Sequence, residues 1–242
     1  MYLKRIAFIV LLPVCFELAR AAEATFVAPA PGEYISEKGR GTLTVARSAD
    51  GKVHFNISAV GANGHSCSID GGIKEGKAVL TDPVTDDPCP VSFKPDAQGV
   101  EILLGSQGEC RDYCGARAWF DGRYLVPAPG CRNRERNATE KKFSRLYGSK
   151  DYQAALNMLQ PVLNDCAATL NWLEEAQVRN DLAVTLYHLG RKEDCLAVLK
   201  PTVDGYGASE SKLKEELPPS DFESFLPLAS AAWYNVKLCS RQ

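Results

Sequence analysis

Histidine, long hydrophobic runs and a surplus of charge of either sign are scarce in this sequence of 242 residues. The three histidines, His54, His65 and His188, do not have the close spacing of metal ligands. After residue 16, no segment approaches the roughly 18 apolar residues that a membrane-spanning helix needs. The formal net charge of −2 provides no basic footprint for nucleic acid. The sequence therefore predicts no metal, no cofactor, no membrane span and no nucleic-acid partner.

Catalytic signatures are missing as well. The sequence has no Gly-x-Ser-x-Gly elbow and no His-Glu-x-x-His helix. Residues Gly71–Lys77 have the spacing of a phosphate-binding loop, but Ala78 stands where such a loop carries a hydroxyl, so a hairpin turn is expected instead. His65 and Cys67 fit one face of a strand, but a cysteine in a disulfide is not a nucleophilic thiolate. We therefore expect no enzyme activity and assign no catalytic residue.

Residues 1–21 have the pattern of a signal peptide. Positive charge at residues 4–5 precedes an apolar run over residues 6–16, and Ala19-Arg20-Ala21 is a small-x-small cleavage site. A buried N-terminal helix and a lipid anchor at Cys15 are the alternatives. The pattern predicts a periplasmic or secreted protein.

The cysteines agree with export. Of nine cysteines, eight remain when Cys15 leaves with the signal peptide. An even number behind a signal peptide is typical of a disulfide framework, whereas zinc sites show several tight Cys or His pairs. The predicted disulfide cysteines are Cys67, Cys89, Cys110, Cys114, Cys131, Cys166, Cys195 and Cys239.

Residues 32–130 have the pattern of an antiparallel β domain. Thr42–Val45 and Val53–Ile57 alternate apolar and polar residues, and Asp50-Gly51 between them is a strong hairpin signal. Further candidate strands are Cys67–Ile69, Ala78–Thr81, Val91–Lys94, Val100–Leu104 and Ala116–Phe120. So many short strands within about 95 residues predict a small disulfide-bonded barrel or sandwich.

Residues 133–242 change to a helical period and contain an internal repeat. Leu146-Tyr147 recurs as Leu186-Tyr187, and Leu159-x-Pro161 recurs as Leu199-x-Pro201, each at an offset of 40 residues. A single helix pair cannot bury its own apolar face, so repeated pairs predict a small α-solenoid. The predicted fold class is therefore α+β, with two domains.

Helix geometry suggests two of the disulfide pairs. Expected helices from Ala138 to Gly148 and from Asp151 to Asp165 form a hairpin that brings Cys131 to Cys166.

A helix beginning at Lys192 and a last helix, capped by Ser220 or Asp221, would similarly bring Cys195 to Cys239. For the β domain we expect Cys67–Cys89 and Cys110–Cys114, although sequence alone leaves other connectivities open.

The helical half resembles tetratricopeptide repeats. The segment RNDLAVTLYHLGRKEDCLAVLKP, residues 179–201, matches that motif near Asn180, Ala183, Tyr187, Gly190 and Pro201. The earlier segment FSRLYGSKDYQAALNMLQP matches through Tyr147, Tyr152, Ala155 and Pro161. The period exceeds 34 residues and the motif's tryptophan is absent, so the resemblance concerns shape and does not identify a partner.

Residues 40–127 resemble another family. The run GANGHSCSIDGGI…CPVSFKP…GECRDYCGARAWFDGRYLVP is similar to the cysteine-containing β domain of exported bacterial proteins, among them LprI-like lysozyme inhibitors. The Ser-Gly-x-x-Tyr loop of periplasmic lysozyme inhibitors is absent here, so no inhibitory residue is assigned. The resemblance implies an exported protein that binds another protein.

The segment Cys110–Pro127 holds the candidate binding residues, because arginine and aromatic side chains are enriched at binding hot spots. Closure of the β domain by its aromatic residues is the alternative role. The candidates are Arg111, Asp112, Tyr113, Arg117, Trp119 and Tyr124. Together with the concave side of the helices, this segment predicts a non-enzymatic binding protein of the bacterial envelope, one form of which inhibits a cell-wall hydrolase such as lysozyme. The alternative is a structural or assembly factor that recruits envelope partners through its helices.

Overall fold

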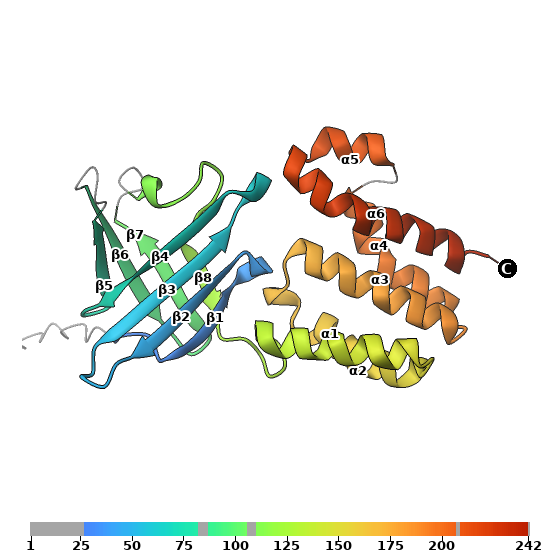
Figure 1. Ribbon diagram of the computed structural model, residues 1–242, viewed down its shortest axis with the longest axis horizontal. Helices are drawn as coiled ribbons and strands as arrows, with labels where there is room; N and C mark the ends of the chain where they lie inside the picture. The colour runs from blue at the N-terminus through green and yellow to red at the C-terminus, as the bar shows by residue number, and fades with distance from the viewer. Residues whose placement is uncertain (1–26, 82–86, 106–109, 207–208, 242) are drawn as a thin grey trace, which may run out of the picture.

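A computed structural model places a β-barrel beside a group of helices (Figure 1). It describes residues 27–81, 87–105, 110–206 and 209–241. The predicted signal peptide, residues 1–21, lies outside the described residues. The chain leaves the barrel once and then forms the helices in sequence (Figure 1).

Eight antiparallel strands form the barrel, in the order β4-β3-β2-β1-β8-β7-β6-β5. Every neighbouring pair is consecutive in the chain except β1 and β8, which join the two ends of the meander. The edge strands β4 and β5 are linked by a tight turn through Lys74 and Lys77, so the barrel is nearly closed. The strands are β1 Gly32–Ser36, β2 Gly41–Arg47, β3 Val53–Val60, β4 Ser66–Ile73, β5 Lys77–Thr81, β6 Pro88–Pro95, β7 Gly99–Leu104 and β8 Gly122–Leu125.

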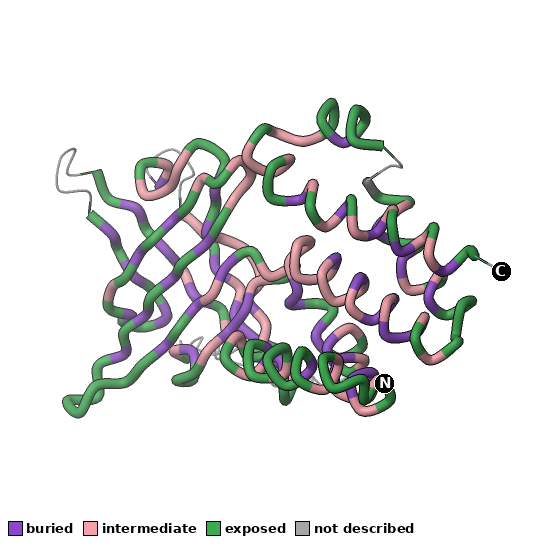
Figure 2. Tube along the Cα trace, turned by 45° about the vertical axis from the view of Figure 1, so that its right-hand side comes forward, coloured by how far each residue is buried: buried purple, intermediate pink, exposed green. Residues whose placement is uncertain are grey.

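Alternation of side chains fills the barrel. Along β3, Val53, Phe55, Ile57 and Ala59 are buried while the residues between them are exposed, and the other strands show related patterns (Figure 2). Phe55 packs on Phe93 of β6, with ring centroids 4.9 Å apart. The expected hairpin turns form at Asp50-Gly51 and between β4 and β5, which leaves Gly71 inside a strand and not in a phosphate loop.

One predicted strand is wrong. Residues Ala116–Phe120 alternate as expected, with Ala118 and Phe120 buried and Trp119 exposed, but they pair with no strand. The partner edge of β7 is taken by β8, two residues further along. The segment instead begins with a turn in which the Ala118 N–H donates to the Gly115 carbonyl over 3.0 Å.

The described residues after the barrel form six α-helices. They are α1 Asn133–Gly148, α2 Tyr152–Asp165, α3 Trp172–His188, α4 Lys192–Tyr206, α5 Glu210–Glu216 and α6 Pro219–Cys239. Four short 3₁₀ turns are η1 Glu37–Gly39, η2 Ala62–Gly64, η3 Arg111–Tyr113 and η4 Ala167–Thr169. The helix expected from Ala138 begins earlier, at Asn133, because the Glu135 carboxylate accepts hydrogen bonds from the backbone N–H groups of Gly130 and Arg132.

Helices α1 to α4 repeat at the predicted spacing. The helices α2 and α4 begin 40 residues apart, and both Leu159 and Leu199 are buried. Pro161 and Pro201 do not end these helices as a breaking position would; both lie inside them. Helix α2 continues past Pro161 because later backbone bonds form, such as Cys166 N–H to the Val162 carbonyl at 3.2 Å.

Four disulfides connect the described cysteines. The predicted Cys131–Cys166 and Cys195–Cys239 pairs are confirmed, with Cα–Cα distances of 5.3 and 6.2 Å. The predicted Cys67–Cys89 and Cys110–Cys114 pairs are wrong, because the barrel contains Cys67–Cys114 and Cys89–Cys110. The Cys114 backbone lies along the open edge of β4 opposite Cys67, so the neighbouring thiol of Cys110 reaches Cys89 on β6 instead.

Four disulfides are typical of proteins that fold outside the cytoplasm. Among the helices of the described residues, none combines the length and apolar character that a membrane crossing requires.

Candidate functional site

A cleft of about 510 Å³ lies where one end of the barrel meets the helices. Its barrel wall consists of η1 and the connection from β3 into η2, and its helical wall of the first turns of α3 and α6. Lys38 and Arg40 line the first wall, and Trp172 lines the second. We call this hollow the interdomain cleft.

Close backbone approach at Gly39 forms the base of this junction. Gly39 has a φ of +63°, and a side chain there would overlap the backbone of residues 169–171 between η4 and α3. Glycine alone avoids both the unfavourable backbone region and this overlap. The barrel and the helices are therefore in contact through main-chain atoms at this point.

A pair of reciprocal hydrogen bonds closes the other side of the cleft. The Asn63 N–H in η2 donates to Asp221 Oδ1 over 2.8 Å, and the Ser220 N–H in α6 donates to Asn63 Oδ1 over 3.0 Å. The expectation that Ser220 or Asp221 caps the last helix is wrong, because Pro218 occupies the N-cap position. Asn63 caps the first turn of α6 from the barrel, which explains why two polar residues stand there.

A smaller cavity of about 210 Å³ adjoins the cleft on the barrel side. Arg40, Val60 and Gly61 line both hollows, so the two form one continuous depression. Three of the six predicted binding residues, Arg117, Trp119 and Tyr124, line this smaller cavity. The structure thus brings part of the predicted segment to the edge of the interdomain cleft.

Trp119 and Arg111 form the most exposed recognition feature of this region. The Trp119 side chain is 52% exposed, and the Arg111 guanidinium lies 4.4 Å from the centroid of its ring. Arg111 also donates to the Ala116 carbonyl, which holds the guanidinium over the indole. A cation stacked on an exposed tryptophan presents a large apolar face beside a fixed positive charge.

The remaining candidates divide between surface and core. Asp112 is exposed on η3, and Tyr113 packs partly buried against the barrel core. Tyr124 is fully buried, and its hydroxyl donates to the Phe120 carbonyl over 2.9 Å. Burial, and secondarily the charge of Asp121, raises the pKa of Tyr124 above its ordinary value. Tyr124 therefore has the alternative role named from the sequence, filling the barrel.

One ion pair orders the wall of the smaller cavity. Arg123 of β8 donates to Asp96 Oδ1 over 2.6 Å, and the Gln98 and Gly99 N–H groups donate to the same oxygen. The hydrogen bond from Arg123, followed by that from Gln98, lowers the pKa of Asp96 to about 2. Asp96 thus remains ionised at physiological pH and fixes the turn between β6 and β7.

Sequence reasoning missed the helical contribution to the site. Trp172 and Ser220 lie more than 45 residues from the predicted segment and reach the cleft only through the packing of the helices on the barrel. Arg40 was missed because a single arginine beside a glycine has no distinguishing pattern. The Asn63 side chain is the one local signal, since its residue has a φ of +58° and stands in an Asn-Gly turn.

Within the described part of the chain, no group of three or more histidine, cysteine or acidic residues is arranged to hold a metal ion. The walls of the cleft supply aromatic faces, guanidinium groups and open backbone, which are groups that bind polypeptides. Comparisons with protein-family models, with curated proteins and with solved structures find no match to this chain.

Proposed function

We propose that this chain is an exported, non-enzymatic protein-binding module of the bacterial envelope, and that the interdomain cleft receives part of its partner. The single observation that carries the proposal is Trp119, exposed beside the cleft with Arg111 stacked on its ring. Exposed tryptophan and arginine are the residue types that contribute most to protein–protein binding energy. The partner we favour is a cell-wall hydrolase such as lysozyme, which the binding would inhibit.

Several features support this proposal without depending on the identity of the partner. The disulfides agree with a periplasmic or secreted location. The 40-residue spacing of α1–α2 and α3–α4 supports two tetratricopeptide-like helix pairs, an architecture suited to protein recognition. The resemblance of residues 40–127 to the β domain of LprI-like inhibitors supports a hydrolase as partner.

An inhibition assay with matched variants tests the proposal. Lysozyme activity on bacterial cell walls is measured with increasing amounts of the full chain, of Trp119→Ala and of Tyr234→Ala. Tyr234 is a matched control because it is an aromatic residue on α6, 59% exposed, and does not line the cleft. We expect inhibition at stoichiometric amounts by the wild type and by Tyr234→Ala, and a loss of about tenfold or more with Trp119→Ala. Equal inhibition by all three proteins would place the contact elsewhere.

A structural or assembly factor is the second candidate, favoured by the helical repeat itself. In that case the helices recruit envelope proteins and lysozyme remains active. Crosslinking from a photoreactive residue at position 119, compared with position 234, separates the two functions. Inhibition with crosslinks at position 119 supports the first, and crosslinks to other envelope proteins without inhibition support the second.

A further inference from the structure

A second hollow, of about 310 Å³, lies among the helices α1, α2 and α3. Leu159 and Val162 of α2 are buried at its base, while Val178 of α3 and Leu228 of α6 remain partly exposed along its sides. We call it the α1–α3 groove. Leu173 lines both this groove and the interdomain cleft, but the two hollows otherwise have different walls.

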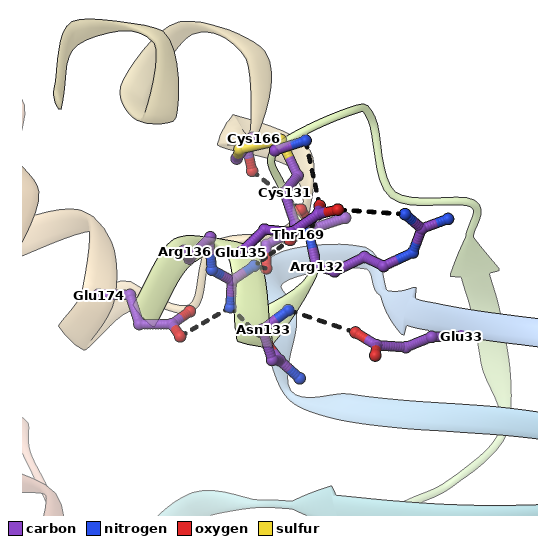
Figure 3. Close-up of a disulfide and its surroundings, with 10 residues drawn as sticks. Glu33, Cys131, Arg132, Asn133, Glu135, Arg136, Cys166, Thr169 and Glu174 are labelled. Carbon is purple, nitrogen blue, oxygen red and sulfur yellow. Dashed lines mark hydrogen bonds and ion pairs between the residues drawn. A yellow bond between two sulfur atoms is a disulfide. The ribbon is translucent and has the colours of Figure 1, made fainter. Parts of the chain in front are cut away.

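At one end of the groove the charges are already paired. Arg136 of α1 is only 9% exposed and donates to the Glu174 carboxylate over 2.8 Å. Its guanidinium also donates to the Cys131 carbonyl at 3.0 Å and to Asn133 Oδ1 at 2.7 Å (Figure 3). Both Arg136 and Glu174 therefore hold the fold together, and the arginine does not neutralise other groups in the groove.

At the other end, two carboxylates line an apolar surface. Glu140 lies on α1 and Asp181 on α3, and both line the groove. Asp181 accepts a hydrogen bond from Gln177 Nε2 over 2.9 Å. Among the described residues, no salt bridge involves Glu140 or Asp181. Burial, together with the charge of Glu140, raises the pKa of Asp181, so the two carboxylates repel each other across the groove.

We propose that the α1–α3 groove binds a basic and apolar segment of a partner polypeptide, with a lysine or arginine head group between Glu140 and Asp181. The long stems of lysine and arginine cover apolar surface while their charged ends reach a carboxylate. The groove offers both parts at once, with Val178 and Leu228 for the stem and neighbouring apolar residues, and two carboxylates for the cation. This goes beyond the proposed function, because it assigns a separate surface and a defined chemistry to the helices.

Fluorescence anisotropy with designed peptides tests the proposal. One labelled peptide combines leucine and lysine, and a second replaces each lysine by glutamine. Each is titrated with the full chain, with the double variant Glu140→Gln and Asp181→Asn, and with Glu193→Gln. Glu193 is an exposed carboxylate on α4 that does not line the groove, so its variant controls for loss of one negative charge. Asn at position 181 keeps an oxygen for the Gln177 hydrogen bond, and thermal melting checks that each variant is folded.

We expect the wild type and Glu193→Gln to bind the lysine peptide equally, and the double variant to bind it about tenfold more weakly. The affinity of the wild type should also fall as salt is added. No binding by the wild type, equal binding of both peptides, or equal binding by the double variant each overturns the proposal. A melting temperature that rises with calcium chloride only in the wild type, without peptide binding, overturns it in favour of an inorganic cation. Trp119→Ala should bind the lysine peptide normally, so this test fails or succeeds independently of the interdomain cleft.

Discussion

Cys131 and Cys166 are 35 residues apart in the chain, yet their Cα atoms lie 5.3 Å apart and their sulfur atoms are bonded. The helices α1 and α2 run out and back between them, so the disulfide closes the open end of this hairpin (Figure 3). The same point joins the barrel to the helices, because the Asn133 N–H donates to Glu33 Oε1 of β1 over 3.3 Å. One bridge therefore secures both the first helix pair and its attachment.

Replacing Cys131 and Cys166 together by serine should loosen this first helix pair. Chain-entropy estimates for a loop of 35 residues give a loss of about 3–4 kcal/mol in the free energy of unfolding. We expect backbone amides of α1 and α2 to exchange faster with deuterium, while amides of the barrel strands remain protected. Equal loss of protection in β3 and α1 would show that the two halves unfold as one unit.

Tryptic mapping without reduction should distinguish the barrel disulfides. Trypsin cleaves after Arg111 and so separates Cys110 from Cys114. We expect the Cys114 peptide to be linked to Cys67 and the Cys110 peptide to Cys89. Mass spectrometry identifies each linked pair, and a fragment joining Cys110 to Cys114 would contradict the observed connectivity.

Gly39→Ala should weaken the contact between barrel and helices, and Gly51→Ala is its matched control. Both glycines have a positive φ, of +63° and +82°, so both substitutions carry a backbone cost of about 1–2 kcal/mol. Only Gly39 faces backbone of the helical half, where overpacking adds about 1–3 kcal/mol. Urea unfolding should therefore show a clearly larger loss for Gly39→Ala. Equal losses would mean that the junction adjusts without cost.

Asp181→Asn should stabilise the protein at neutral pH. The folded pKa of Asp181 is raised, chiefly by burial, so its ionised form opposes folding above that pKa. This penalty disappears as the pH falls below the pKa of the unfolded chain, where the carboxyl is protonated in both states. The difference in melting temperature between Asp181→Asn and the wild type should therefore be largest near pH 7 and shrink toward pH 4. A variant less stable than the wild type at pH 7 would show that the carboxylate has a favourable partner.

Local patterns in the sequence predicted most of the secondary structure. Alternation along Val53–Ile57 and the Asp50-Gly51 turn act within a few residues, so they identify β3 and its hairpin directly. The helical repeat similarly predicted α2 and α4, and with them the Cys131–Cys166 pair, because an antiparallel hairpin needs only the positions of its turn and ends. Helix α5 was missed because a single short amphipathic turn has little periodicity.

Contacts between distant segments were beyond these patterns. The pairing of β1 with β8 sets which loops meet at each end of the barrel, and nothing within either strand specifies its partner. The same topology places Cys114 beside Cys67, which spacing alone assigned to other partners. The candidate site required both halves, since Trp119 and Trp172 meet at one depression only after the helices dock.

The barrel disulfides are nested, with Cys89–Cys110 enclosed in sequence by Cys67–Cys114. Thiols that oxidise in the order of their synthesis would first join Cys67 to Cys89, because these are the first two of the four to emerge. That bond must then be broken by thiol–disulfide exchange, or delayed until β4 and β6 are in place. The helical pairs need no such exchange, since Cys131 meets Cys166, and Cys195 meets Cys239, in chain order. Oxidative maturation of this protein should thus depend on disulfide isomerisation in the barrel, and much less in the helices.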